Sequence, residues 1–310
     1  MLLSFAFCTF NRADRLEKLV AAMRAQVCPI PFEILAVNNN SRDATLAVLE
    51  RLSQQPGAPL RVVTETAPGI VPARNRALRE AIDSDLLVFI DDDELPRTGL
   101  LQAATHALID EGAVCAGGRV IVNFAPYARP DWLGDDLLGF LAGVDYGAEA
   151  FWITTPDTPI WTANIAYAMR LFRDDPELRF DPRYNRAGTA VGGGEDIAMF
   201  GKLLSRGATM RYRPDMQVEH FVEPWRLRRR YFLKLHYQAG LRKGEHELPR
   251  YARTVFGVPP FLLMQVLRHG VRTLEVAITR RRELVRQAMN ATHAWGLLKG
   301  YANRHTGGPS

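Results

Sequence analysis

Residues 86–94, LLVFIDDDE, decide how the rest of the chain can be arranged. Five apolar residues are followed by three consecutive aspartates, Asp91, Asp92 and Asp93. An unbroken apolar run of this length is typical of a strand that is covered on both faces in an α/β sheet. The adjacent carboxylates repel one another and do nothing for the stability of a strand end. They indicate either a divalent cation site, because hard cations take oxygen ligands, or a solvated acidic turn.

The composition is that of a globular protein, with 47% hydrophobic and 24% charged residues in a chain of 310. Three cysteines, Cys8, Cys28 and Cys115, stand at no metal-ligand spacing, which argues against a disulfide framework or a zinc site and fits a reducing compartment. The N-terminus has no basic segment and no small-residue cleavage site, so we expect a first strand there rather than a signal peptide. No stretch approaches about 18 uninterrupted apolar residues, so we expect no membrane-spanning helix.

The charge is unevenly distributed along the chain. Residues 223–310 contain 17 Lys and Arg against 5 Asp and Glu, whereas residues 1–222 contain 22 against 29. The basic part therefore predicts an anionic partner, which is a membrane surface, a lipid phosphate or a nucleic acid.

The first 90 residues alternate between strand and helix patterns. Strands are expected at 2–9, 32–37, 60–64 and 86–90, with helices at 13–25, after Asp43, and at 73–82. This alternation specifies an α/β fold with a mainly parallel central sheet and flanking helices. In such sheets ligands bind beyond the carboxyl ends of the strands, where the three aspartates lie.

The later pattern is looser. We expect a helix at 100–110, strands at 114–122, 209–213 and 217–222, and a helix at 197–205 opened by Glu195 and Asp196. Residues 123–160 are irregular and rich in aromatic residues, which either stack on sugar rings or pack the segment down. The two acids also suit a helix N-terminus as simple caps, and a lone histidine such as His220 is more often a satisfied strand residue than a ligand.

Several short motifs follow one another along residues 1–222. They are TFNR (9–12), EILAVNNNSRD (33–43), APGIVPARNRAL (67–78), FIDDDE (89–94), WTANIAYAMR (161–170), GGGED (192–196) and VEH (218–220). Over residues 1–222 the sequence resembles glycosyltransferase family 2, of the Rossmann-like GT-A fold. The resemblance implies an inverting transfer of a sugar from a nucleotide-sugar to a hydroxyl acceptor, with Mg²⁺ or Mn²⁺ as cofactor.

The resemblance also implies roles for individual residues. Asp93 matches the metal ligand of the DxD motif, and His220 matches a position that reaches the metal or the diphosphate in some relatives. Asp196 matches the general base, with Glu195 beside it. The remaining matches are Thr9, Asn11, Arg12, Arg74, Asp91 and Asp92 for the nucleotide-sugar, and Trp161, Thr162 and Asn164 for the loop that borders the sugar and the acceptor.

Asn38 departs from the family pattern, since many relatives have an aspartate there that accepts a hydrogen bond from the uracil ring. An amide both accepts and donates. A UDP-sugar is therefore the favoured donor, while GDP- and dTDP-sugars stay open.

The C-terminal part, residues 223–310, is predicted to be a basic helical extension of a catalytic domain at 1–222. That domain divides into a nucleotide-sugar half at 1–122 and an acceptor half at 123–222. An apolar-rich helix is expected at 256–278, interrupted by Pro259 and Pro260 and followed by three arginines. It is either a membrane-surface element or an ordinary helix packed on the catalytic domain.

The sequence thus predicts a glycosyltransferase for surface polysaccharide, lipopolysaccharide or glycolipid assembly. We expect a saccharide or lipid-linked acceptor and a cytoplasmic location, peripheral at the inner face of the cytoplasmic membrane. A nucleotidyltransferase acting on sugar phosphates is an alternative, but it should have a Gly-rich basic loop after the first strand, and TFNRADR is not one. The other alternative is a non-enzymatic protein that binds anionic polymers. Nucleic acid is not expected, because residues 1–222 are acidic and carry no nucleic-acid motif.

Overall fold

The computed structural model describes residues 1–186, 193–280 and 283–306. The chain forms two compact units. The first unit comprises Met1–Ala125, Leu141–Gly188 and Glu195–Val222, and the second comprises Pro126–Phe140, Thr189–Gly194 and Glu223–Ser310.

A single sheet forms the centre of the first unit. Over the described residues it has nine strands in the order β3-β2-β1-β4-β8-β6-β9-β5, with β7 paired to β9. The strands are β1 (Leu3–Thr9), β2 (Phe32–Asn38), β3 (Leu60–Thr64), β4 (Leu86–Ile90), β5 (Glu94–Pro96), β6 (Cys115–Asn123), β7 (Phe151–Ile153), β8 (Asn164–Ala168) and β9 (Met210–Phe221). Strands β1 to β4 are parallel, as predicted, whereas β8 pairs antiparallel to both β4 and β6. Every residue of β4 is buried, which confirms the expectation for the run at 86–90.

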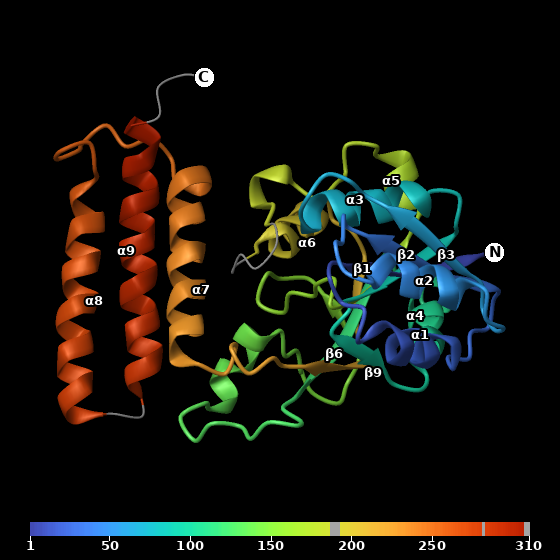
Figure 1. The fold of residues 1–310 in the computed structure, drawn as a ribbon. Coiled ribbons are helices and arrows are strands. Elements are labelled where there is room, and N and C mark those ends of the chain that lie inside the picture. Colours follow the sequence, from blue (N-terminus) through green and yellow to red (C-terminus); the bar gives the residue numbers. More distant parts are fainter. Residues whose placement is uncertain (187–192, 281–282, 307–310) are drawn as a thin grey trace. The chain divides into compact units, whose positions relative to one another are not determined.

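Helices cover both faces of this sheet, with α1 and α3 on opposite sides (Figure 1). The apolar residues of α1 at 16, 19, 20 and 23 are all buried, in agreement with its helical spacing. The helical segments of the first unit are α1 (Leu16–Arg24), α2 (Thr45–Ser53), α3 (Ile70–Glu80), α4 (Leu100–Thr105), η1 (His106–Asp110), α5 (Arg170–Asp174), η3 (Pro182–Tyr184) and α6 (Glu195–Ser205).

Two predictions of element bounds in the first unit were wrong. The helix expected at 73–82 begins three residues earlier, directly after Gly69, whose φ of +120° suits glycine. The strands expected at 209–213 and 217–222 are one strand, β9, which continues through Pro214. Strand β6 pairs with β9 on both sides of this proline, with a register shift after Gly118. The backbone of β9 approaches Gly118 closely there, and a Cβ at Gly118 would lie 1.9 Å from the carbonyl oxygen of Met216.

The aromatic residues of the segment 123–160 mostly pack against protein. In the second unit, the ring of Trp132 lies 5.3 Å from that of Phe232, and the ring of Phe140 lies 4.5 Å from that of His236. This segment includes η2 (Asp135–Leu141). In the first unit, Tyr146 and Phe151 both contact Tyr212, at 5.3 and 5.0 Å. These four rings therefore follow the packing alternative.

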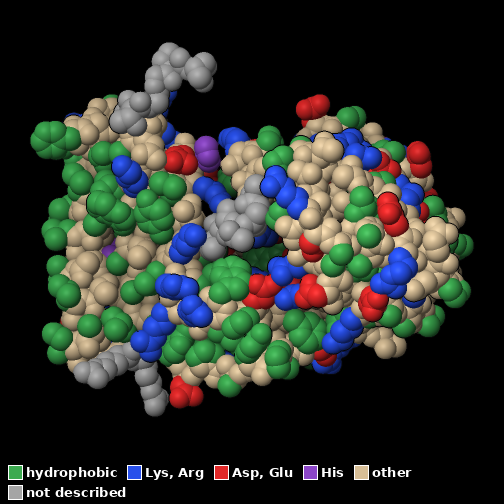
Figure 2. Space-filling view, viewed as in Figure 1, with side chains coloured by type: hydrophobic (Ala, Val, Ile, Leu, Met, Phe, Trp, Pro, Cys, Tyr) green, Lys and Arg blue, Asp and Glu red, His purple; other side chains and the backbone are tan. Residues whose placement is uncertain are grey.

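The second unit is a helical bundle in which α9 (Leu284–Thr306) lies between α7 (Arg229–Arg242) and α8 (Pro260–Thr279) (Figure 1). A short segment, η4 (Lys243–Glu247), extends α7. The helix expected at 256–278 begins only at Pro260, because proline is tolerated in the first turn but not in a helix interior. Hydrophobic side chains gather over the outer side of α8 (Figure 2).

Helices α7 and α9 run parallel and touch through glycines. A Cβ at Gly240 would lie 2.1 Å from the carbonyl oxygen of His293, and one at Gly244 would lie 2.4 Å from that of Leu297. Two glycines of α9, Gly296 and Gly300, face the α7 side in the same way. The two backbones can approach this closely only because the four positions carry no side chain.

We expect Gly240→Ala and Gly296→Ala each to destabilise the protein by about 1–3 kcal/mol, because the added methyl group has no space between the helices. Urea denaturation followed by circular dichroism measures this loss. Gly270→Ala in α8 is the matched control, since nothing lies within 4 Å of its added Cβ. It should be neutral or stabilising by up to about 1 kcal/mol. Equal midpoints for the Gly240 and Gly270 variants would contradict the packing described.

Candidate active site

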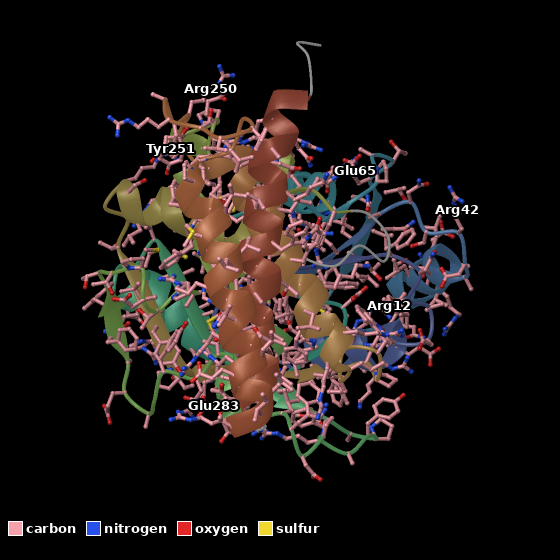
Figure 3. All side chains as sticks on the ribbon, turned by 90° about the vertical axis from the view of Figure 1, so that its left-hand side faces the viewer. Arg12, Arg42, Glu65, Arg250, Tyr251 and Glu283 are labelled. Carbon is pink, nitrogen blue, oxygen red and sulfur yellow. The ribbon has the colours of Figure 1, made fainter. Side chains whose placement is uncertain are left out.

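The loops that follow β1 and β2 form one connected edge at the carboxyl ends of the parallel strands. The amide of Arg12 donates to Thr45 Oγ1 at 2.8 Å, and that of Asn11 donates to Ser41 Oγ at 3.0 Å. Asn11 Oδ1 in turn accepts from the amide of Arg42 at 2.8 Å. Both Arg12 and Arg42 lie in this part of the first unit (Figure 3). The structure thus links the two loops that were predicted to lie near the nucleotide. Thr9, which was also predicted for the nucleotide, is the last residue of β1.

Asn38 ends β2 and Asn39 follows it, and the two residues make different contacts. Asn38 is buried, and its Oδ1 accepts from the amide of Ser41 at 3.3 Å. Asn39 donates to the carbonyl oxygens of Glu65 and Ala67, at 3.1 and 2.7 Å. Sequence reasoning included Asn39 in the polar loop expected near the nucleotide but gave it no role of its own; its place in a run of three asparagines at a strand end is typical of a loop-fixing residue.

The three aspartates after β4 face three different basic side chains. Asp91 Oδ1 accepts from Arg74 at 3.2 Å. Asp92 Oδ1 lies 3.9 Å from Arg12 Nε, and Asp93 Oδ2 lies 3.4 Å from His220 Nε2. Each aspartate of the cluster therefore lies close to a basic side chain from another part of the chain, and the cluster is not simply a solvated turn.

Negative charge exceeds positive charge around the aspartates. Burial, and then the charge of Asp93, raises the pKa of Asp92 to about 7. Glu94 is buried, and its Oε2 accepts from the amide of Asp91 at 2.7 Å. Burial and the charges of Asp91 and Asp93 raise its pKa well above the usual range. Sequence reasoning also assigned no role to Glu94, although it directly follows the acidic run.

The pair Asp93 and His220 has the chemistry of a partial metal site. A carboxylate oxygen and an imidazole nitrogen are both metal donors, and they lie 3.4 Å apart. Among the described residues, no group of three or more His, Cys, Asp and Glu side chains could hold a metal ion. Two protein ligands fit a Mg²⁺- or Mn²⁺-type cation, which commonly takes its other ligands from substrate phosphates and water. The raised pKa values of the neighbouring carboxyls also fit a site that gains positive charge.

Arg74 of α3 lies at the centre of the predicted catalytic residues. It is buried, and its guanidinium donates to Glu195 at 2.9 Å, to Asp196 at 3.0 Å and to Asp91 at 3.2 Å. Burial by itself would lower the pKa of Arg74, but the three carboxylates raise it above its ordinary value. The guanidinium of Arg74 thus joins the residue after β4 to the first turn of α6.

Glu195 and Asp196 occupy different environments although they are neighbours. The Glu195 side chain is 1% exposed and that of Asp196 is 22% exposed. Burial and the charge of Asp196 raise the pKa of Glu195, and Arg74 opposes that rise. Their contacts with Arg74 give both acids a role beyond helix capping. Of the predicted glycine segment before them, Gly192 lies outside the described residues.

Of the three residues predicted for the sugar and acceptor loop, Thr162 contacts Asp196, whereas the bonds of Asn164 go to neighbouring strands. Thr162 is buried and donates to Asp196 Oδ1 through its hydroxyl, with its amide 3.4 Å from the same oxygen. Asn164 lies in β8, and its Nδ2 donates to the carbonyl oxygens of Arg119 and Met216, at 2.9 and 2.8 Å. Trp161 is half-buried against the core. Thr162 therefore contacts the predicted base, whereas the amide nitrogen of Asn164 holds the sheet together.

Two curated relatives match short stretches of this chain. The Uncharacterized glycosyltransferase YfnE of Bacillus subtilis (strain 168) is 36% identical over 94 residues, which are 30% of this chain and 23% of that protein. Glycosyltransferase AglE of Haloferax volcanii is 25% identical over 112 residues, 36% of each chain. The chain thus matches well under half of the length of either relative.

Solved structures resemble the chain over most of its length. S. aureus TarS 1–349, solved in complex with UDP, has a TM-score of 0.56 at 16% identity and covers 96% of this chain and 90% of its own. The mannosyltransferase PcManGT from Pyrobaculum calidifontis, solved with GDP-Man and Mn²⁺, has a TM-score of 0.60 at 19% identity. The match covers 96% of this chain and 86% of that protein's chain. At these identities the likeness establishes the fold, and it confirms the predicted fold class.

The match to a family decides the classification. The family described as Glycosyl transferase family 2 matches residues 4–178, which is more than half of the chain and includes the loops after β1, β2 and β4. The predicted family is confirmed: the chain belongs to glycosyl transferase family 2.

Proposed function

We propose that this protein transfers a sugar from a nucleotide-sugar to a hydroxyl acceptor, with inversion at the anomeric carbon and a divalent cation. The observation that carries the proposal is the Arg74 network, which joins the acidic end of β4 to Asp196 at the start of α6. The ligands of the structural relatives, UDP in one and GDP-Man with Mn²⁺ in the other, support this donor class and this cofactor.

Asp196 is the proposed general base. Within the described residues, the bonds from Arg74 and Thr162 all reach its Oδ1, so Oδ2 is the oxygen that we assign to the acceptor hydroxyl. As the acceptor oxygen attacks the anomeric carbon, its proton passes to Oδ2. The bond from that carbon to the diphosphate breaks, and the electron pair leaves with the nucleoside diphosphate. Attack from the face opposite the leaving group inverts the configuration.

Glu195 has a supporting role in this proposal. It is buried beside Asp196 and shares the same Arg74 nitrogen, so it fixes the position of the guanidinium. Arg74 in turn donates to Asp196 Oδ1 at 3.0 Å and so holds the proposed base in place.

Asp93 and His220 are the residues that would hold the cation. When bound, it supplies charge neutralisation for the departing diphosphate. Thr9, Asn11, Arg12 and Asn38 belong to the loops that we assign to the nucleotide, because their polar groups line the carboxyl edge of the sheet. A UDP-sugar is the favoured donor, with GDP- and dTDP-sugars as the alternatives to test.

We assign the acceptor to surface polysaccharide, lipopolysaccharide or glycolipid assembly at the inner face of the cytoplasmic membrane, on a saccharide or a lipid-linked acceptor. The support is the excess of basic residues at 223–310. Among the helices described, none combines the length and the apolar character needed to cross a bilayer.

Thermal unfolding with UDP, GDP, dTDP and CMP, each with and without Mn²⁺, should show a metal-dependent stabilisation by one nucleotide. A ligand at a hundredfold excess over its Kd stabilises by about 2.7 kcal/mol. Asp93→Asn should remove the metal-dependent part, because Asp93 is the predicted ligand. Asp110→Asn, an exposed change at the end of η1, is the control and should leave it intact. No shift with any nucleotide would remove the main support for the transferase proposal.

Asp196→Asn should lower kcat by about 10²- to 10⁴-fold, since the amide cannot accept the proton. Donor affinity, measured by the same nucleotide-induced stabilisation, should stay near the wild-type value. Asp174→Asn changes an exposed aspartate in the same way and should keep normal turnover. Near-normal turnover of Asp196→Asn would show that the base is misassigned, and Glu195→Gln would then be examined.

A further inference from the structure

Helix α8 is apolar on two opposite faces. One face is internal, where Leu262 and Val276 are buried and Leu262 packs with Val258, Leu297 and Tyr301. The other face consists of Met264, Leu267, Val271, Leu274 and Ile278, whose exposed fractions run from 58% to 84%. We call these five residues the outer stripe.

The spacing of the outer stripe makes it continuous. Successive members are three or four residues apart, so their side chains lie one above another along the helix. The helix has 20 residues and is therefore about 30 Å long. An apolar stripe of this length that faces water indicates an interaction surface, because monomeric soluble proteins rarely expose large contiguous apolar patches. Figure 2 shows hydrophobic side chains gathered over α8.

Further exposed apolar residues stand at the N-terminal end of the stripe. Phe256 is fully exposed at the tip of a turn that is closed by a bridge between Val255 and Val258. Its φ of +51° is uncommon for an aromatic residue. Phe261 and Leu263, at the start of α8, are 48% and 41% exposed. The turn therefore holds a large aromatic side chain out in solvent, four residues before α8 begins.

The charges of this unit decide between the occupants that such a stripe could have. Residues 223–310 carry 17 basic against 5 acidic residues, so two copies that paired through α8 would bring like charges together. On α8 itself, Arg268 and Arg272 are exposed beside the stripe, and Arg272 pairs with Glu275 at 2.8 Å. Arg250, before α8, and Glu283, after it, mark the two ends of this helix in the view onto α8 (Figure 3). Positive charge next to an apolar stripe complements an anionic lipid surface.

We propose that the outer stripe of α8, with Phe256 and Phe261, lies in the boundary between headgroups and acyl chains of an anionic membrane, with the helix axis parallel to the surface. The arginines beside the stripe contact the lipid phosphates. This names the surface by which the enzyme proposed above reaches a membrane acceptor, so its biological meaning rests on that proposed function. Lipid binding itself requires no catalysis, and the two can be tested separately.

The test uses the full chain and sedimentation with vesicles. One vesicle preparation contains phosphatidylcholine alone, and the other contains equal parts of phosphatidylcholine and phosphatidylglycerol. The wild-type protein should bind the mixed vesicles, with affinity that falls as salt rises, and should bind phosphatidylcholine alone much more weakly.

The double variant Leu267→Gln/Leu274→Gln should bind the mixed vesicles at least about tenfold more weakly, because each leucine loses its transfer into the apolar layer. Arg268→Gln/Arg272→Gln should weaken binding several-fold and reduce its salt dependence. Ile109→Gln is the matched control: it replaces an exposed apolar residue of the first unit and should bind as wild type does. All substituted side chains are exposed, so folding should be retained, and circular dichroism verifies this.

Equal binding of wild type and the leucine variant to mixed vesicles would overturn the proposal, as would no binding by wild type. A dimer in solution that the leucine variant converts to a monomer, with vesicle binding unchanged, would assign the stripe to a second copy and also overturn it. The nucleotide-induced stabilisation is measured on the same samples. If it is absent while vesicles bind, the transferase proposal fails and the lipid surface stands; if it is present without vesicle binding, the reverse holds.

Discussion

The buried guanidinium of Arg74 is the constraint on which the rest of the site depends. Removing one partner of a buried ion pair typically costs about 3–5 kcal/mol, because it leaves an uncompensated charge. Here one arginine serves Asp91, Glu195 and Asp196 together, at distances of 2.9 to 3.2 Å. The end of β4, helix α3 and the first turn of α6 are therefore held in one geometry, and the proposed base is positioned by the same contact that positions the acidic cluster.

A single arginine does not balance the carboxylates gathered around it. Burial, and then the charges of neighbouring carboxylates, raise the pKa of both Asp92 and Glu94 at this edge of the sheet. Arg12 and His220 each approach an aspartate oxygen of the cluster, at 3.9 and 3.4 Å. An arrangement that is costly for the protein alone suits a site that takes up a cation and a diphosphate, since strain and unbalanced charge are often retained at functional sites.

The second unit is held together by close helix packing rather than by buried charges. Its interior depends on the absence of side chains, because glycines let α7 and α9 approach backbone to backbone. This close contact leaves α8 as a helix with one face against α9 and the outer stripe in water. Stability within the bundle and recruitment to a surface are thus assigned to opposite faces of the same helix.

The sequence by itself determined the alternation of strands and helices up to β4, the burial of that strand, the acidic run at its end and the family. These are local patterns, or motifs whose order along the chain is visible. Only the tertiary structure decided that Arg74 meets Glu195 and Asp196, which follow 121 and 122 residues later, and that Thr162 joins them. It also placed Asn39 and Glu94 among the contacts of the site and divided the apolar residues of α8 between two faces. The physical reason is that hydrophobic periodicity reports which face of an element is apolar, whereas the partner of a buried charge, or of an apolar face, is set by packing between elements that are distant in sequence.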